Sequence, residues 1–162
     1  MRLSLAHSFD APPDQVAQIL LDPRFQRSLG DIGALREREV LSQDSTPTGV
    51  ERRVRCVLDV EMNGIARRFL GDGDPAWVEV AVWDSSSRTW TWHIEPEMGA
   101  DLLDAKGTTR IVEAGSGAEK LTEAEVKVRV PLYGAKVEGW IADGLRQAYD
   151  QEADRIAEWV SA

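Results

Sequence analysis

Cysteine and histidine are scarce in this chain of 162 residues, which has one cysteine, Cys56, and two histidines, His7 and His93. A lone cysteine excludes an intramolecular disulfide, and we therefore expect a protein of a reducing compartment, the cytoplasm. These three residues are far apart and lack the ligand spacing of a zinc site, so we predict no metal and no cofactor. Cys56 lies in a valine-rich segment and is interpreted as a small core residue.

Motifs for covalent catalysis and nucleotide binding are also missing. The sequence contains no G-x-S-x-G nucleophile elbow and no glycine-rich phosphate loop ahead of a helix, so it predicts no catalytic residue. The formal net charge of −9 disfavours nucleic acid as a partner. No apolar run approaches the ~18 residues of a membrane span, so we expect no membrane insertion. Residues 1–10 alternate between polar and apolar types, unlike the apolar centre of a signal peptide.

Alternating polar and apolar residues are abundant instead, and this period of two is typical of strands with one buried face. The proline pair Pro12–Pro13, followed by the Asp22 cap and Pro23, predicts two short helices between the first two strands, over about 10–22 and 22–30. A final helix of about 27 residues would span roughly 40 Å, enough to cross a wide sheet. The predicted strands cover about 2–9, 34–42, 49–62, 76–84, 88–96, 107–115 and 118–130.

The expected architecture is α+β, a single domain over residues 1–162 in which the terminal helix covers a curved antiparallel sheet. This order, with "LLDPRF" in the short helices, resembles the helix-grip fold of the START/Bet v 1-like (SRPBCC) superfamily. Two segments, "ARRFLGDGDPAWVEVAVW" and "VPLYGAKVEGWIADGLRQAYDQEADRIAEWV", are similar to the DUF2505-type branch. The resemblance implies about seven strands around the helix, with an apolar cavity between them. It brings no catalytic residues.

Members of this superfamily bind lipids, sterols, polyketides or plant hormones, and some are cyclases, aromatases or chaperone cofactors. The resemblance therefore implies a binding protein that holds a hydrophobic small molecule or lipid in the cavity. A polyketide cyclase/aromatase-like enzyme on the same cavity is one alternative. A protein-partner module of the chaperone-cofactor or toxin–antitoxin type is the other. The residues expected to line the cavity, as the inward positions of strands and helix, are Cys56, Leu58, Trp90, Trp92, Val126, Val128, Trp140, Ile141, Gly144, Leu145, Ala148, Tyr149 and Glu152.

Four features leave alternatives open at this stage. Gly144, placed on the apolar face of the terminal helix, would admit either an aromatic ring or a ligand. Glu152 falls in the apolar stripe, where it would pair with an arginine, reach solvent at the end of the sheet, or act on a ligand. His93 faces either water or the cavity, depending on strand register. The tryptophans of the 76–96 hairpin form either a cross-strand stack or a ligand platform.

Overall fold

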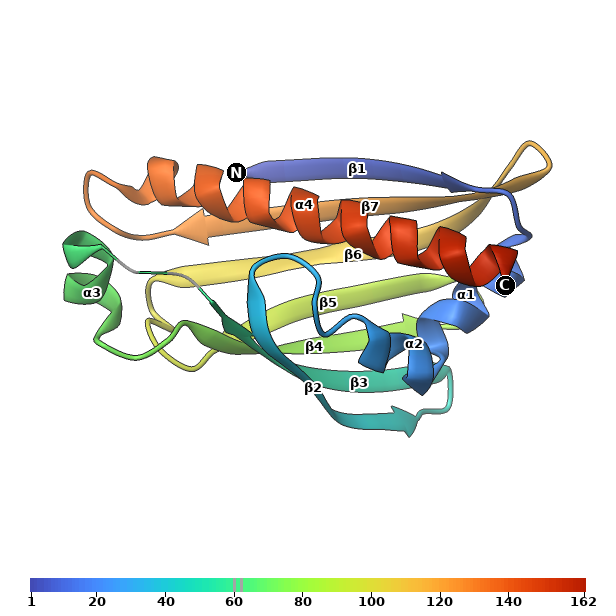
Figure 1. Ribbon diagram of the computed structural model, residues 1–162, viewed down its shortest axis with the longest axis horizontal. Helices are drawn as coiled ribbons and strands as arrows, with labels where there is room; N and C mark the ends of the chain where they lie inside the picture. The colour runs from blue at the N-terminus through green and yellow to red at the C-terminus, as the bar shows by residue number, and fades with distance from the viewer. Residues whose placement is uncertain (60, 62) are drawn as a thin grey trace.

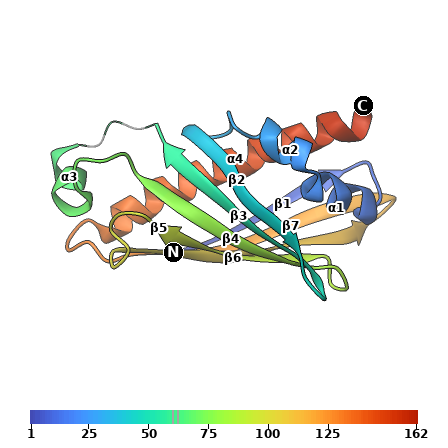
Figure 2. The ribbon, with the colours of Figure 1, turned by 90° about the horizontal axis from the view of Figure 1, so that it is seen from below.

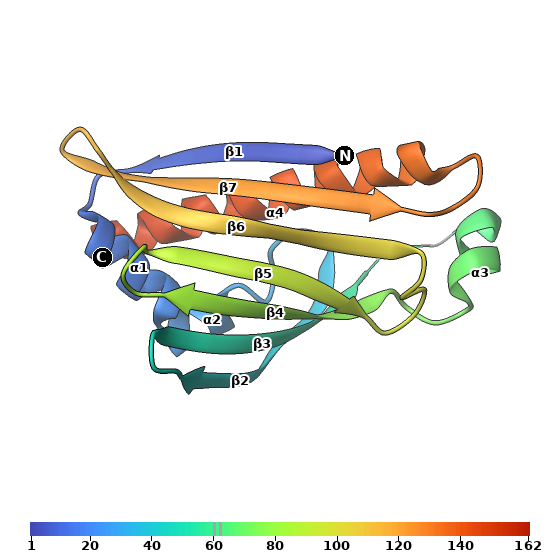
Figure 3. The same ribbon diagram turned by 180° about the vertical axis from the view of Figure 1, so that it is seen from behind.

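A computed structural model describes residues 1–59, 61 and 63–162. Seven antiparallel strands form one sheet in the order β1-β7-β6-β5-β4-β3-β2, and a long helix crosses one face (Figure 1). In the described part of the chain, the opposite face carries no helix (Figure 3). The predicted helix-grip architecture is therefore confirmed. The elements are β1 Arg2–Phe9, α1 Pro13–Leu21, α2 Pro23–Ser28, β2 Leu35–Ser45, β3 Gly49–Leu58, α3 Gly64–Leu70, β4 Ala76–Asp84, β5 Thr89–Pro96, β6 Leu103–Ala114, β7 Gly117–Val128 and α4 Gly134–Ser161.

The two short helices begin as the sequence predicts. Pro13 occupies the first turn of α1, where its missing N–H leaves no hydrogen bond unmade. Asp22 caps α2, because its carboxylate accepts a 2.8 Å hydrogen bond from the Arg24 backbone N–H. The predicted strand over 49–62 is wrong at its end, since β3 stops at Leu58. Positions 60 and 62 of that prediction lie outside the described residues.

A helix that the sequence did not predict follows β3. Asn63 caps α3 by accepting a 2.9 Å hydrogen bond from the Ala66 backbone N–H, and Gly71 ends it with a positive φ of 86°. The helix lies at the end of the sheet opposite to α1 and α2 (Figures 1 and 3). The two ends of the molecule are therefore built from different segments.

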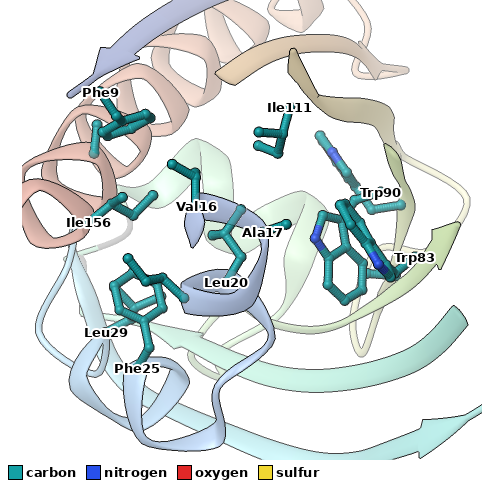
Figure 4. Packing of buried hydrophobic residues seen from close by; sticks show 14 of the residues in the cluster. Phe9, Val16, Ala17, Leu20, Phe25, Leu29, Trp83, Trp90, Ile111 and Ile156 are labelled. Atoms are coloured by element: carbon teal, nitrogen blue, oxygen red, sulfur yellow. The ribbon is translucent and has the colours of Figure 1, made fainter. Parts of the chain in front are cut away.

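The hydrophobic core is densest at the α1–α2 end. Val16 and Leu20 of α1 are almost fully buried and lie between Ile156 of α4 and the sheet (Figure 4). Phe25 of α2 is also fully buried and meets Trp159 edge to face, with ring centres 5.3 Å apart. These contacts close this end of the space under α4.

A glycine in the middle of the sheet makes room for a large aromatic ring. A Cβ on Gly107 of β6 would lie 2.6 Å from the Trp92 ring and 2.2 Å from the carbonyl oxygen of Glu123. Only glycine fits between the indole and the neighbouring strand, so Gly107 lets Trp92 lie flat against the inner face.

Candidate functional site

The long helix is placed asymmetrically over the sheet. Its close backbone approaches are to β7, β1 and α1, so it leans toward one edge (Figure 2). Away from α1 and α2, several inward apolar side chains keep partial solvent access. They come from four elements and are Ile94, Leu103, Val128, Ile141 and Leu145. The space that these side chains face, between β5–β7 and the first half of α4, is called the recess below.

A buried ion pair joins α4 to the sheet beside this recess. The Lys120 side chain on β7 is completely buried, and its ammonium group donates a hydrogen bond to the carboxylate of Glu152 on α4. Burial alone would raise the pKa of Glu152, but the Lys120 charge and hydrogen bond outweigh burial and hold it below its ordinary value. Lys120 also lies 5.0 Å from the centre of the Tyr149 ring. The pair fixes the middle of α4 to β7.

A second buried cation lies on the other side of the recess. Arg52 of β3 is 6% exposed, and its Nη1 donates a 2.9 Å hydrogen bond to the carbonyl oxygen of Leu20 at the end of α1. Its guanidinium lies 4.3 Å from the Trp90 ring centre. Its Nε has no hydrogen-bond partner among the described residues. Burial lowers the pKa of Arg52 to about 10, so the group remains charged at neutral pH.

Glu79 of β4 is a further charged group on the inner face. It lies opposite Val54 and Ile94 in the register. Burial raises the pKa of its carboxyl, although the charges of Arg52 and Arg38 oppose this effect. The residue nevertheless retains partial solvent access.

Tyr149 of α4 completes the polar lining opposite the sheet. Burial, followed by the charges of Glu79 and Glu152, raises the pKa of its phenol well above the ordinary value. Tyr149 therefore stays protonated and can donate a hydrogen bond. Thr109 and Thr122, whose hydroxyl oxygens are 3.3 Å apart, lie on the facing strands β6 and β7.

A scan against family models finds that residues 4–160 match "Protein of unknown function (DUF2505)". The chain belongs to the DUF2505 family. A search of curated proteins finds no match to this DUF2505 protein.

Solved structures resemble this DUF2505 protein along almost its whole length. Norcoclaurine synthase from Thalictrum flavum has a TM-score of 0.67 and 17% identity, covering 99% of this chain and 86% of that one. A START superfamily protein from Mycobacterium smegmatis has a TM-score of 0.65 and 11% identity, covering 98% of both chains. The Zhui aromatase/cyclase from Streptomyces sp. R1128 has a TM-score of 0.60 and 11% identity, covering 98% and 89%. At these identities the likeness shows the fold alone, that of the START/Bet v 1-like (SRPBCC) superfamily.

Most of the predicted lining residues of this DUF2505 protein lie on inward-facing positions. The inward ones are Cys56, Leu58, Trp90, Trp92, Val126, Val128, Ile141, Leu145, Tyr149 and Glu152. Their contact with a ligand stays a prediction. The two tryptophans of the hairpin that face each other, Trp83 and Trp90, have ring centres 5.4 Å apart, as expected for a cross-strand pair.

Three predicted lining residues of α4 are placed elsewhere. Gly144 is exposed, and a Cβ built on it meets no atom within 4 Å, so the alternative in which it admits an aromatic ring is wrong. Its contact with a ligand stays a prediction. Trp140 is 53% exposed, with Lys136 over its ring. Ala148 lies beside Gly33 in the loop after α2 rather than over the sheet. The buried residues of α4 are Ala142, Ala153 and Ile156. Its inner face therefore includes Ile141, Leu145 and Glu152 but is centred away from Gly144 and Ala148.

Two further expectations are decided by the geometry. Of the three alternatives for Glu152, the structure shows an ion pair, but the partner is Lys120 rather than an arginine. His93 is 54% exposed at its side chain and lies 3.7 Å from Glu95 on the outer face, where the strands border an open hollow of about 650 Å³. His93 is therefore outside the recess. In the part of the chain that the structure describes, no three His, Cys, Asp or Glu side chains cluster to hold a metal ion, and no helix is long and apolar enough to span a membrane.

The sequence reasoning did not single out four inner charged residues, although alternation places each of them. Lys120 has the same parity as inward Thr122, Arg52 as Val54, and Glu79 as Trp83, while Arg38 pairs with inward Cys56. Their position in the pattern indicates the interior, but charged residues are rarely found there.

Proposed function

We propose that the protein binds a hydrophobic small molecule or lipid in the recess between the inner face of the sheet and α4. The observation that carries the proposal is the contrast between the two ends of this space. At one end, α1 and α2 bury Val16 and Phe25 completely. At the other, inward apolar side chains such as Ile94, Ile141 and Leu145 remain partly accessible. Apolar surface left open inside a concave fold is a site for an apolar guest.

Native mass spectrometry of the purified protein, followed by solvent extraction, tests this proposal. We expect a stoichiometric apolar adduct, together with a rise in melting temperature when apolar ligands are added. Leu145→Trp would fill the recess and abolish the adduct, whereas Arg146→Trp on the exposed side of α4 would retain it. A wild-type protein that stays ligand-free and shows no melting shift across a lipid and polyketide panel would contradict the proposal.

A cyclase- or aromatase-like enzyme using the same recess is the second candidate. Glu79, Arg52 and Tyr149 support it, because charged and hydrogen-bonding groups inside an apolar site can polarise a carbonyl. Turnover of an extracted guest, lost on Glu79→Gln, would favour this candidate over a container. A ligand-free protein would instead favour a protein partner, which could contact exposed Leu132 and Trp140. The buried free thiol of Cys56 fits the cytoplasmic location included in this proposal.

A further inference from the structure

Glu79 and Arg52 occupy diagonal positions on the inner faces of neighbouring strands. Arg52 pairs with Ala81, two residues from Glu79 on the same side of β4. Diagonal side chains are ~7–8 Å apart at the backbone, within reach of each other or of one small group between them. Within the described residues, the two form no ion pair at 4 Å or less, the distance that defines a salt bridge, while Arg53 beside them pairs with Glu95 at 2.7 Å on the outer face.

Both inner groups retain unused hydrogen-bonding capacity. Arg52 uses Nη1 to hold the end of α1, but its buried Nε–H donates to no described residue. The indole N–H groups of Trp90 and Trp92 are buried on the same face and are also without a described acceptor. The Glu79 carboxylate is an acceptor for which no hydrogen bond appears among the described residues. The inner face thus carries donors and an acceptor that have no described partners.

Fold stability accounts for the Arg52 contacts with Leu20 and Trp90, but not for Glu79. A carboxylate on the inner face without an ion-pair partner is destabilising, and an apolar side chain of similar size would serve the core better. By contrast, Lys120 and Glu152 satisfy each other, and Arg38 donates 2.6 and 2.7 Å hydrogen bonds to Gln26. Glu79 and Arg52 are therefore the inner charged groups still able to bind a guest.

We propose that Glu79 and Arg52 anchor a hydroxyl group of an otherwise apolar guest, an alcohol or a phenol. This inference rests on the proposed function. A hydroxyl oxygen accepts from Arg52 Nε–H while the hydroxyl hydrogen is donated to Glu79, so one group satisfies both. A pure hydrocarbon would leave both unpaired, and an anionic guest would meet the Glu79 carboxylate.

Binding of three probes of one shape tests the anchor: 2-naphthol, naphthalene and 2-naphthoate, titrated at pH 7 against the full-length protein. We expect 2-naphthol to bind about tenfold more tightly than naphthalene, the difference of one good hydrogen-bonded pair. Equal binding of 2-naphthol and naphthalene would overturn the anchor and leave the proposed function standing. Preference for 2-naphthoate would also overturn it. Failure of all three to bind would count against both the anchor and the proposed function.

Substitutions test whether the side chains of Glu79 and Arg52 cause the preference for 2-naphthol over naphthalene. Glu79→Leu should raise the melting temperature and at the same time remove the preference for 2-naphthol, a combination that a purely structural residue would not give. Arg52→Met should also remove the preference, and Arg53→Met, the adjacent arginine that points to the outer face, should keep it. A Glu79→Leu protein that still prefers 2-naphthol tenfold would overturn the proposal even if Arg52→Met fails to fold.

Discussion

Replacing Lys120 by methionine should destabilise the protein strongly at pH 7. The change leaves the Glu152 carboxylate, 16% exposed, without the cation that neutralises it. Breaking a buried ion pair from one side costs about 3–5 kcal/mol. Since Glu152 keeps some contact with water, we expect the lower end, about 3 kcal/mol, or roughly 6–12 °C in melting temperature for a chain of this length.

The pH dependence of this loss gives a second test. In the wild type the pKa of Glu152 is below its ordinary value, so its stabilising contribution is present above the unfolded pKa and is lost as pH falls through the folded one. Without Lys120, burial dominates and raises the pKa of Glu152, so protonation now relieves the buried charge. The difference in unfolding free energy between the wild type and Lys120→Met should therefore be smaller at pH 5 than at pH 7.

Urea unfolding followed by tryptophan fluorescence at both pH values measures the difference. Lys127→Met, on the outward face of the same strand, is the matched control and should change stability by less than about 0.5 kcal/mol. Adding Glu152→Leu to Lys120→Met should recover most of the loss, because both charges are then absent. If Lys120→Met lowers the unfolding free energy by less than about 1 kcal/mol at pH 7, the reasoning is refuted. It is also refuted if this loss of stability is larger at pH 5 than at pH 7.

Three other predictions follow from the geometry. Gly107→Ala should lower the melting temperature markedly, because the new methyl group would meet the Glu123 carbonyl and the Trp92 ring. Gly144→Ala, whose methyl group meets nothing within 4 Å, should stabilise the protein by about 0.5–1 kcal/mol. Thermal melts of both variants measure these effects. A destabilising Gly144→Ala would contradict the exposed position of Gly144 on α4. The Cys56 thiol, whose pKa burial raises to about 12, should resist iodoacetamide at pH 8 until urea unfolds the protein, and rapid labelling of the folded protein would disprove its burial.

The succession of strands along the chain and the long helix could be predicted, because alternation and length are local signals. The hairpins β4–β5 and β6–β7 follow directly from apolar alternation around Ser85–Ser87 and Gly115–Gly117. Helix α3 could not be predicted in the same way, since its seven residues are too few for a clear period and its start depends on the Asn63 cap.

The candidate site was harder to predict, because pairing across the fold decides it. Periodicity placed Glu152 on the inner face of α4, but only the register of β7 brings Lys120 beneath it. The error at Gly144 has two causes. A glycine has no side chain whose polarity shows which way it faces, and the buried face of α4 is centred slightly away from the stripe predicted from the sequence. Charged residues at inward positions of alternating strands, such as Glu79, could be placed on the inner face by parity, but parity does not show which partners they meet there.

The edge position of β1 has a consequence for how the chain folds. Strands β2 to β7 each pair with a neighbour in sequence, whereas residues 2–9 pair with residues 118–125. During synthesis β1 therefore stays unpaired until β7 has emerged, and α1 likewise lacks its contacts with β6, β7 and α4 until then. Closing so long a loop is entropically costly and slow relative to hairpin formation. The joining of β1 to β7 is thus expected to be the late, rate-determining event, and the first strand the segment most exposed to wrong partners before it.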